Sequence, residues 1–157
     1  MDDVTLARAL HVLAVVHWIG GVAMVTLVVL PAVRRLAEPK DQLALFEAVE
    51  RRFAAQARWS VLLAGLTGFW MTWRLDAWWR FASPGYWWMH AMLALWLLFA
   101  AVLFVAEPLV LHDRLRQRAR QDPGGTMRLM LRAHRVALTL AVVTVVAAVL
   151  GAHGMLY

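Results

Sequence analysis

The sequence contains no cysteine and few charged residues. Without cysteine the chain cannot form disulfides or thiolate metal sites, and cysteine usage says nothing about its redox compartment. Only 17% of the 157 residues are charged and 62% are hydrophobic, which leaves less polar surface than a soluble domain of this size exposes. The first apolar run lacks a basic stretch ahead of it, so no cleavable signal is expected. No nucleophile and base are arranged for hydrolysis.

Four apolar runs are long enough to cross a bilayer as helices, which takes about 20 residues. They are residues 6–30, 54–73, 86–111 and 134–156. Short connections make consecutive helices antiparallel neighbours, and the runs are too long and uniform for barrel strands. We therefore predict a single integral membrane domain, 1–157, of the all-α class: a transmembrane four-helix bundle. Pro31 is expected to close the first span.

The basic residues are distributed unevenly over the connections. Eleven arginines and lysines lie in the first and third connections, against three in the N-terminal tail and the second connection. The positive-inside rule then places both termini on the periplasmic side of a bacterial inner membrane. The net charge of +6 is thus assigned to topology and anionic lipid head groups, not to nucleic acid.

Two connecting segments have patterns of their own. The stretch EAVERRFAAQAR, residues 47–58, predicts an amphipathic helix that leads into the second span. The stretch QDPGGTM, residues 121–127, predicts a flexible turn because proline and two glycines follow each other.

Histidines lie inside the apolar runs. A rise of about 1.5 Å per residue places His11, His90 and His153 at similar heights in the outer half of the bundle. A histidine in lipid is costly, so it usually faces the bundle interior. A hydrogen bond between helices, or an interfacial position, explains any one of them alone. Three at one depth favour a bound metal, because imidazole is a common ligand of haem iron, copper and zinc.

The two histidines of the first span lie on different helix faces. His11 shares a face with Trp18, whereas His17, six residues further on, is in line with Gly21. We expect one to face a cofactor and the other to pair with a neighbouring helix. Glycines offer either a flat apolar slot for haem or close helix packing. These glycines are Gly20, Gly21, Gly65, Gly68, Gly151 and Gly154.

Three stretches resemble two related four-span families, the HemJ-type protoporphyrinogen oxidases and the CopD-type copper-resistance membrane domains. LHVLAVVHWIGG (10–21) resembles their first helix, and ERRFAAQARWSVLLAGLTGFWM (50–71) resembles their second. WMHAMLAL (88–95) resembles a Trp-x-His-x-Lys stretch of the HemJ type. The resemblance implies that His11 is a haem ligand and that Trp18 belongs to the same motif.

The sequence departs from the HemJ pattern at two places. Met92 stands at the lysine position, and RAHRVAL (132–138) replaces an Asn-Glu-x-Pro-like element. We therefore expect haem binding without protoporphyrinogen oxidation. The CopD resemblance keeps copper as the alternative metal, since copper(I) favours methionine and histidine. The methionines near the outer face are Met71, Met89, Met92 and Met155.

One acidic residue, Glu107, lies inside the third run about one turn from its cytoplasmic end. Arg58 lies at a similar depth in the second run, so an ion pair between the two is the simplest expectation. A polar or proton pathway from Glu107 to His134 is the alternative.

These patterns together predict a membrane-embedded haem b protein. His11 and His90 are the expected axial ligands, with His153 as a substitute for either and His17, Trp18 and Gly21 nearby. The expected role is electron transfer, with a quinone or a redox protein as partner. We expect the chain to act as a homo-oligomer or as a subunit of a larger complex. A copper-handling protein and a cofactor-free assembly subunit are the alternatives.

Overall fold

The computed structural model describes residues 3–156, apart from the side chain of residue 112. Within this range the chain is helical and forms no strand. The all-α prediction is therefore confirmed. The elements in chain order are α1 (Asp3–Met24), the π-helical η1 (Val25–Val29), α2 (Leu30–Leu36), α3 (Gln42–Arg74), the 3₁₀ segments η2 (Trp78–Ala82) and η3 (Pro84–Tyr86), α4 (Trp87–Ala101), the π-helical η4 (Val102–Leu111), α5 (His112–Gln121) and α6 (Pro123–Ala152).

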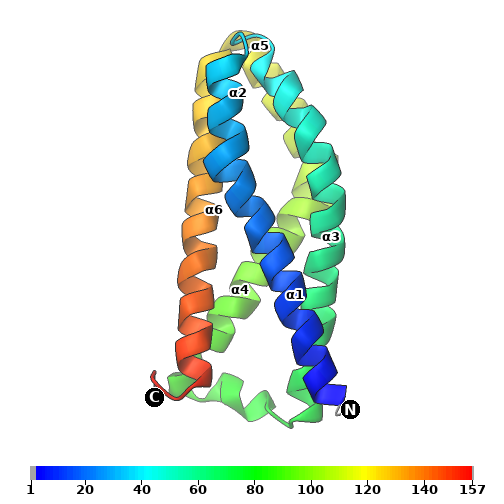
Figure 1. The fold of residues 1–157 in the computed structure, drawn as a ribbon, viewed down its shortest axis with the longest axis vertical. Helices are drawn as coiled ribbons and strands as arrows, with labels where there is room; N and C mark the ends of the chain where they lie inside the picture. Colours follow the sequence, from blue (N-terminus) through cyan, green and yellow to red (C-terminus); the bar gives the residue numbers. More distant parts are fainter. Residues whose placement is uncertain (1–2, 157) are drawn as a thin grey trace.

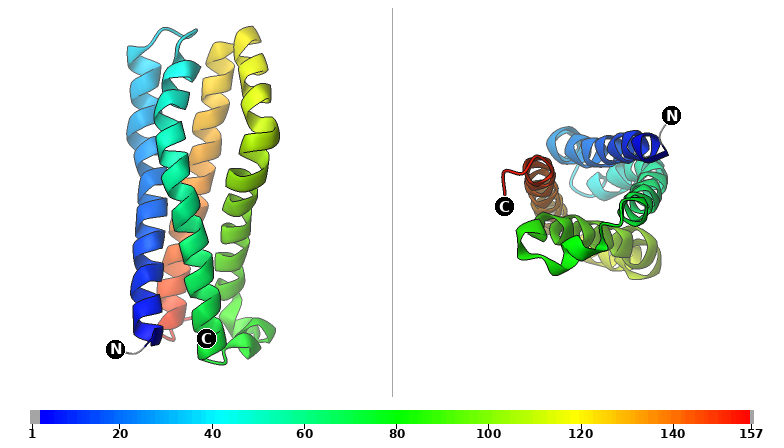
Figure 2. Two further views of the ribbon diagram at one scale, coloured as in Figure 1. Left: turned by 90° about the vertical axis from the view of Figure 1, so that its right-hand side faces the viewer. Right: turned by 90° about the horizontal axis from the view of Figure 1, so that it is seen from below.

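The elements form an elongated bundle of antiparallel columns (Figure 1). α1, η1 and α2 follow one another without a break and form one column, and α4, η4 and α5 form another. α3 and α6 are single helices of 33 and 30 residues. Both chain ends lie at the same end of the bundle, next to η2 and η3, as Figure 2 shows from the side.

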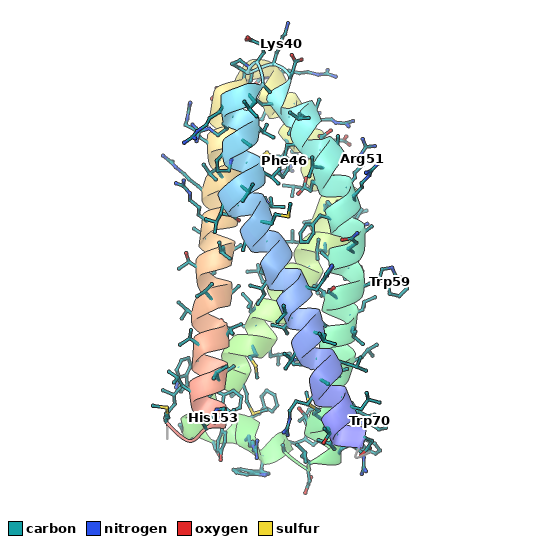
Figure 3. The ribbon with its side chains drawn as sticks, viewed as in Figure 1. Lys40, Phe46, Arg51, Trp59, Trp70 and His153 are labelled. Atoms are coloured by element: carbon teal, nitrogen blue, oxygen red, sulfur yellow. The ribbon has the colours of Figure 1, made fainter. Side chains whose placement is uncertain are left out.

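Three helical stretches are long and apolar enough to cross a membrane: Asp3–Leu36, Pro84–Leu111 and Pro123–Ala152. They contain the predicted spans 6–30 and 86–111 in full and the predicted span 134–156 as far as Ala152, where α6 ends. The remaining predicted span, 54–73, lies within α3, which also carries charged and amide side chains such as Arg58 and Gln56. Large apolar side chains on the outside of the bundle remain uncovered; Trp59 is 74% exposed and Leu66 69%. Trp59 points away from the helices in Figure 3, as expected for a surface that faces lipid.

Two further predicted boundaries are wrong. The first helical column does not end at Pro31 but continues to Leu36, with Pro31 directly after the π-helical η1, where the hydrogen-bonding pattern changes from π to α. The turn predicted for residues 121–127 is the start of α6. Asp122 is the N-cap of this helix, accepting a hydrogen bond of 2.8 Å from the backbone N–H of Gly125, and Pro123 occupies the first turn. The helix predicted for residues 47–58 is confirmed as part of α3.

Apolar contacts form three clusters along the bundle axis. Phe46, Leu30 and Met127 pack together at the end where α2 meets α3. Trp18 and Val61 occupy the middle. The third cluster lies near the chain termini, where side chains of α4 meet α6; its buried members are Trp88, Met89 and Ala147.

Candidate functional site

His11 is held by α3 through a single ring nitrogen. Its Nδ1 lies 2.9 Å from the backbone oxygen of Ala64 and 3.1 Å from Oγ1 of Thr67. A carbonyl oxygen can only accept, so Nδ1 carries the proton and donates it to Ala64. In the neutral ring Nε2 then keeps its lone pair and is free to bind a metal. Metal-binding histidines commonly have this arrangement, in which a carbonyl fixes the tautomer and the ring orientation.

The neighbour of this imidazole is Gly68. A Cβ atom at that position would lie 3.3 Å from Cε1 of His11, so the missing side chain gives the ring room against α3. The His11 side chain thus extends from α1 onto α3 and is partly buried.

His17 is also bound to α3 but in a different way. Its Nδ1 lies 2.8 Å from Oγ of Ser60, and this hydroxyl in turn lies 3.3 Å from the backbone oxygen of Gln56. The His17 side chain is otherwise exposed on the outside of the bundle. Both histidines of the first span therefore bond to α3 through Nδ1, whereas the sequence predicts such a pairing for only one of them.

His90 and His153 lie near the same end of the bundle as His11, but each has its own neighbour. The His90 ring contacts Phe81 of η2 edge to face, with ring centroids 5.3 Å apart. His153 follows α6 directly and donates from Nδ1 to the oxygen of Val149 at 2.8 Å. Both residues are exposed, and Figure 3 shows His153 at the lower end of α6. The structure thus holds His11 and His90 against different elements, α3 and η2.

The chain's own aromatic rings occupy three of the six glycine positions singled out in the sequence. Phe53 fills the place of a Gly21 side chain, and Trp88 fills that of Gly151. At Gly65 an added Cβ would lie 2.6 Å from Trp96. The Trp96 indole is anchored there by a 2.8 Å hydrogen bond from Nε1 to the oxygen of Val61. These glycines serve close packing of α1, α3, α4 and α6 around aromatic side chains.

Trp18 lies in the middle of the bundle and is only 3% exposed. Its ring meets Phe99 of α4 edge to face, with centroids 4.8 Å apart. Its indole N–H has no partner among the residues described. Trp18 therefore joins α1 to α4 by apolar contact, on the face of α1 that also carries His11.

The residues expected to form a polar pathway are separated in part. Arg58 and Glu107 form an ion pair at 3.1 Å, which confirms the simpler expectation for this pair. His134 instead uses Nδ1 to contact the oxygen of Met130 at 3.0 Å, and its ring packs edge to face on Phe46, at 5.9 Å between centroids. The structure thus brings Arg58 and Glu107 together and holds His134 against other partners.

Sequence reasoning missed Glu50, which lies one helical turn from Glu47 on α3. Burial, together with the negative charges of Glu107 and Glu47, raises the pKa of the Glu50 carboxyl from 4.5 to about 7. The two acids beside it have arginine partners of their own: Arg58 binds Glu107, and Arg116 binds Glu47 at 2.8 Å. The spacing of Glu47 and Glu50 was visible in the sequence, but the burial of the Glu50 carboxyl was not.

Among residues 3–156, no three histidine or acidic side chains converge as they would around a metal ion. His11, His134 and His153 each place Nδ1 against a backbone oxygen, and of these three only His11 bonds to another helix. Comparisons with family models, with curated proteins and with solved structures give no match for this chain.

Proposed function

We propose that this chain is a four-span protein of the bacterial inner membrane with both termini on the periplasmic side. The fourth span would be residues 54–73 of α3, which reach about 30 Å at a rise of about 1.5 Å per residue. The ion pair with Glu107 reduces the cost of placing Arg58 in such a span. The termini share one end of the bundle with the tryptophan-rich η2 (Figure 2), and the basic connections lie at the other end, in agreement with the positive-inside rule.

Within this bundle we assign haem b binding to His11. The observation that carries the proposal is the hydrogen bond from Nδ1 of His11 to Ala64, which leaves Nε2 available to iron. His90 is the proposed second ligand and His153 its substitute. Since His90 now packs on Phe81, its ring would have to leave that contact to bind iron. Haem would supply one-electron chemistry.

The chain's own residues would serve electron transfer by holding and shielding this centre. Ala64 and Thr67 fix the His11 ring from α3. Trp18 and its apolar neighbours keep water away from the same face of α1, and a dry environment is one of the factors that set a haem potential. The proposed partners are a quinone on one side and an external acceptor on the other, or the other subunits of a larger oxidoreductase.

The test is an absorption spectrum with metal analysis of the purified full chain, expressed with adequate haem. We expect a Soret band together with iron. His11→Ala should lose both. The matched control is His17→Ala, which removes a histidine of the same helix that is also bonded to α3; it should keep both.

Three results would contradict the proposal. A wild type without a Soret band would exclude resident haem. A spectrum that is unchanged in His11→Ala would exclude His11 as ligand. Copper in place of iron, lost in His11→Ala and Met92→Ala, would support the copper-handling alternative.

A further inference from the structure

A groove of about 500 Å³ runs along the outside of the bundle between the first column and α3. Met24, Val25 and Val29 line it on one side, and Val49 lines it on the other. Phe53 packs into the space left by Gly21 and so lets the two columns approach at the groove floor. The groove is thus largely apolar and opens to the surface that would face lipid.

Two polar side chains, Arg52 and Gln56, lie on the α3 wall of this groove. Arg52 is exposed and makes no hydrogen bond or ion pair within the part of the chain that is described. The groove lining contains no acidic residue. The acids nearest in sequence are not its partners, because Glu47 binds Arg116 and Glu50 has no ion pair among the residues described. A guanidinium without a protein partner beside an apolar groove is complementary to a ligand that combines an anionic group with an apolar tail.

We propose that this groove binds an anionic phospholipid, with the phosphate on Arg52 and an acyl chain along Met24, Val25 and Val29. Guanidinium is well suited to phosphate because it offers several N–H donors in one plane. The groove lies toward the basic end of the bundle. It would therefore be reached from the cytoplasmic leaflet, where anionic lipids attract basic segments. The leaflet assignment rests on the proposed topology, whereas the choice of lipid rests on the groove itself.

Arg51 provides a matched control because it has the same charge and is the adjacent residue. It does not line the groove, and Figure 3 shows it pointing away from the bundle. A diffuse attraction of anionic lipid to the basic end would depend equally on Arg51 and Arg52. A specific site would depend on Arg52 alone.

The experiment titrates the full chain in neutral detergent with dioleoyl phosphatidylglycerol or dioleoyl phosphatidylcholine and measures bound lipid by native mass spectrometry. We expect the anionic lipid to bind more tightly than the zwitterionic one. Arg52→Gln should weaken it about tenfold or more, as expected for loss of charge-assisted hydrogen bonds. Arg51→Gln should change it less than about twofold. Ala48→Phe, which adds bulk at an exposed position of the groove and keeps both arginines, should also weaken binding.

Equal effects of Arg51→Gln and Arg52→Gln would overturn the proposal in favour of diffuse attraction. Equal binding of the two lipids would show that the groove does not select an anion. If the wild type has a dimer mass that Arg52→Gln loses, a second copy of the chain would be the occupant. Full binding in Ala48→Phe would place the lipid elsewhere. The readout does not involve haem: His11→Ala should bind the anionic lipid normally, so this proposal and the haem proposal fail separately.

Discussion

Arg58 donates from Nε to the backbone oxygen of Leu103 at 3.1 Å, across from α3 to η4. η4 is π-helical, and in a π-helix the backbone oxygen of Leu103 would accept a hydrogen bond from the N–H of residue 108, five positions further on. That residue is Pro108, which has no N–H to donate. Arg58 supplies the missing donor and also pairs with Glu107. One side chain thus satisfies both a backbone oxygen and a carboxylate in the same segment.

Replacing Arg58 should destabilise the bundle. Arg58→Leu leaves Glu107 without its counter-ion and the Leu103 oxygen without this donor. Because both side chains of the pair are partly exposed, we expect a loss of about 1–2 kcal/mol, below the value for a fully buried pair. Thermal unfolding in detergent measures it. The double variant Arg58→Leu, Glu107→Gln should recover part of the loss; no recovery would mean that the ion pair contributes nothing.

Glu50 should make stability depend on pH. Its pKa is about 7 in the folded chain and 4.5 ordinarily, so the folded state binds more protons between these values. Stability due to this group is therefore greatest below pH 4.5 and declines as the pH rises to about 7. Glu50→Gln should stabilise the chain at pH 8 by about 1–2 kcal/mol, after allowance for partial exposure.

The measurement for Glu50 is the unfolding temperature between pH 5 and pH 8, at intervals of about half a unit. Glu38→Gln is the control, since Glu38 is an exposed acid whose removal should not change the profile. If the wild type and Glu50→Gln show parallel profiles, Glu50 does not titrate in this range.

The glycines that accommodate indole rings should not tolerate a methyl group. In Gly65→Ala the new Cβ would lie 2.6 Å from Trp96, which is anchored to Val61. Gly151→Ala would meet the Trp88 indole. Overpacking of this kind costs about 1–3 kcal/mol. Gly20→Ala, with nothing within 4 Å of its Cβ, should instead gain up to about 1 kcal/mol from helix propensity. Unfolding of all three in detergent tests the contrast, and a similar response would refute the packing role.

The cap of α6 can be tested with two substitutions at one position. Asp122→Ala removes the acceptor for the Gly125 N–H and should destabilise the chain by about 1 kcal/mol. Asp122→Asn keeps an acceptor oxygen and should cost much less. Equal losses in the two variants would show that the carboxylate charge, and not the cap hydrogen bond, is the stabilising feature.

The sequence alone was sufficient for the secondary structure class, for three apolar spans and for the pairing of Arg58 with Glu107. Long apolar runs can satisfy their backbone polar groups in lipid only as helices, and two opposite charges at the same depth of neighbouring spans attract each other. The sequence was less reliable in predicting where helices begin and end. Asp122-Pro123 has the residues of a helix N-terminus, but the two glycines that follow made the stretch resemble a turn.

The tertiary structure decided what the special residues do. Glycine in an apolar helix is compatible with a cofactor slot or with a close neighbour, and the position of Trp88, Trp96 and Phe53 selects the neighbour. Likewise, the sequence placed His11 and His17 in one helix, but only the packing of α1 on α3 decides that His11 donates to a carbonyl and His17 meets a hydroxyl. The physical reason is the separation along the chain between the residues that interact. Helix formation depends on residues within a turn or two of each other. The partner of a side chain, in contrast, comes from another helix, at a position that the local pattern does not encode.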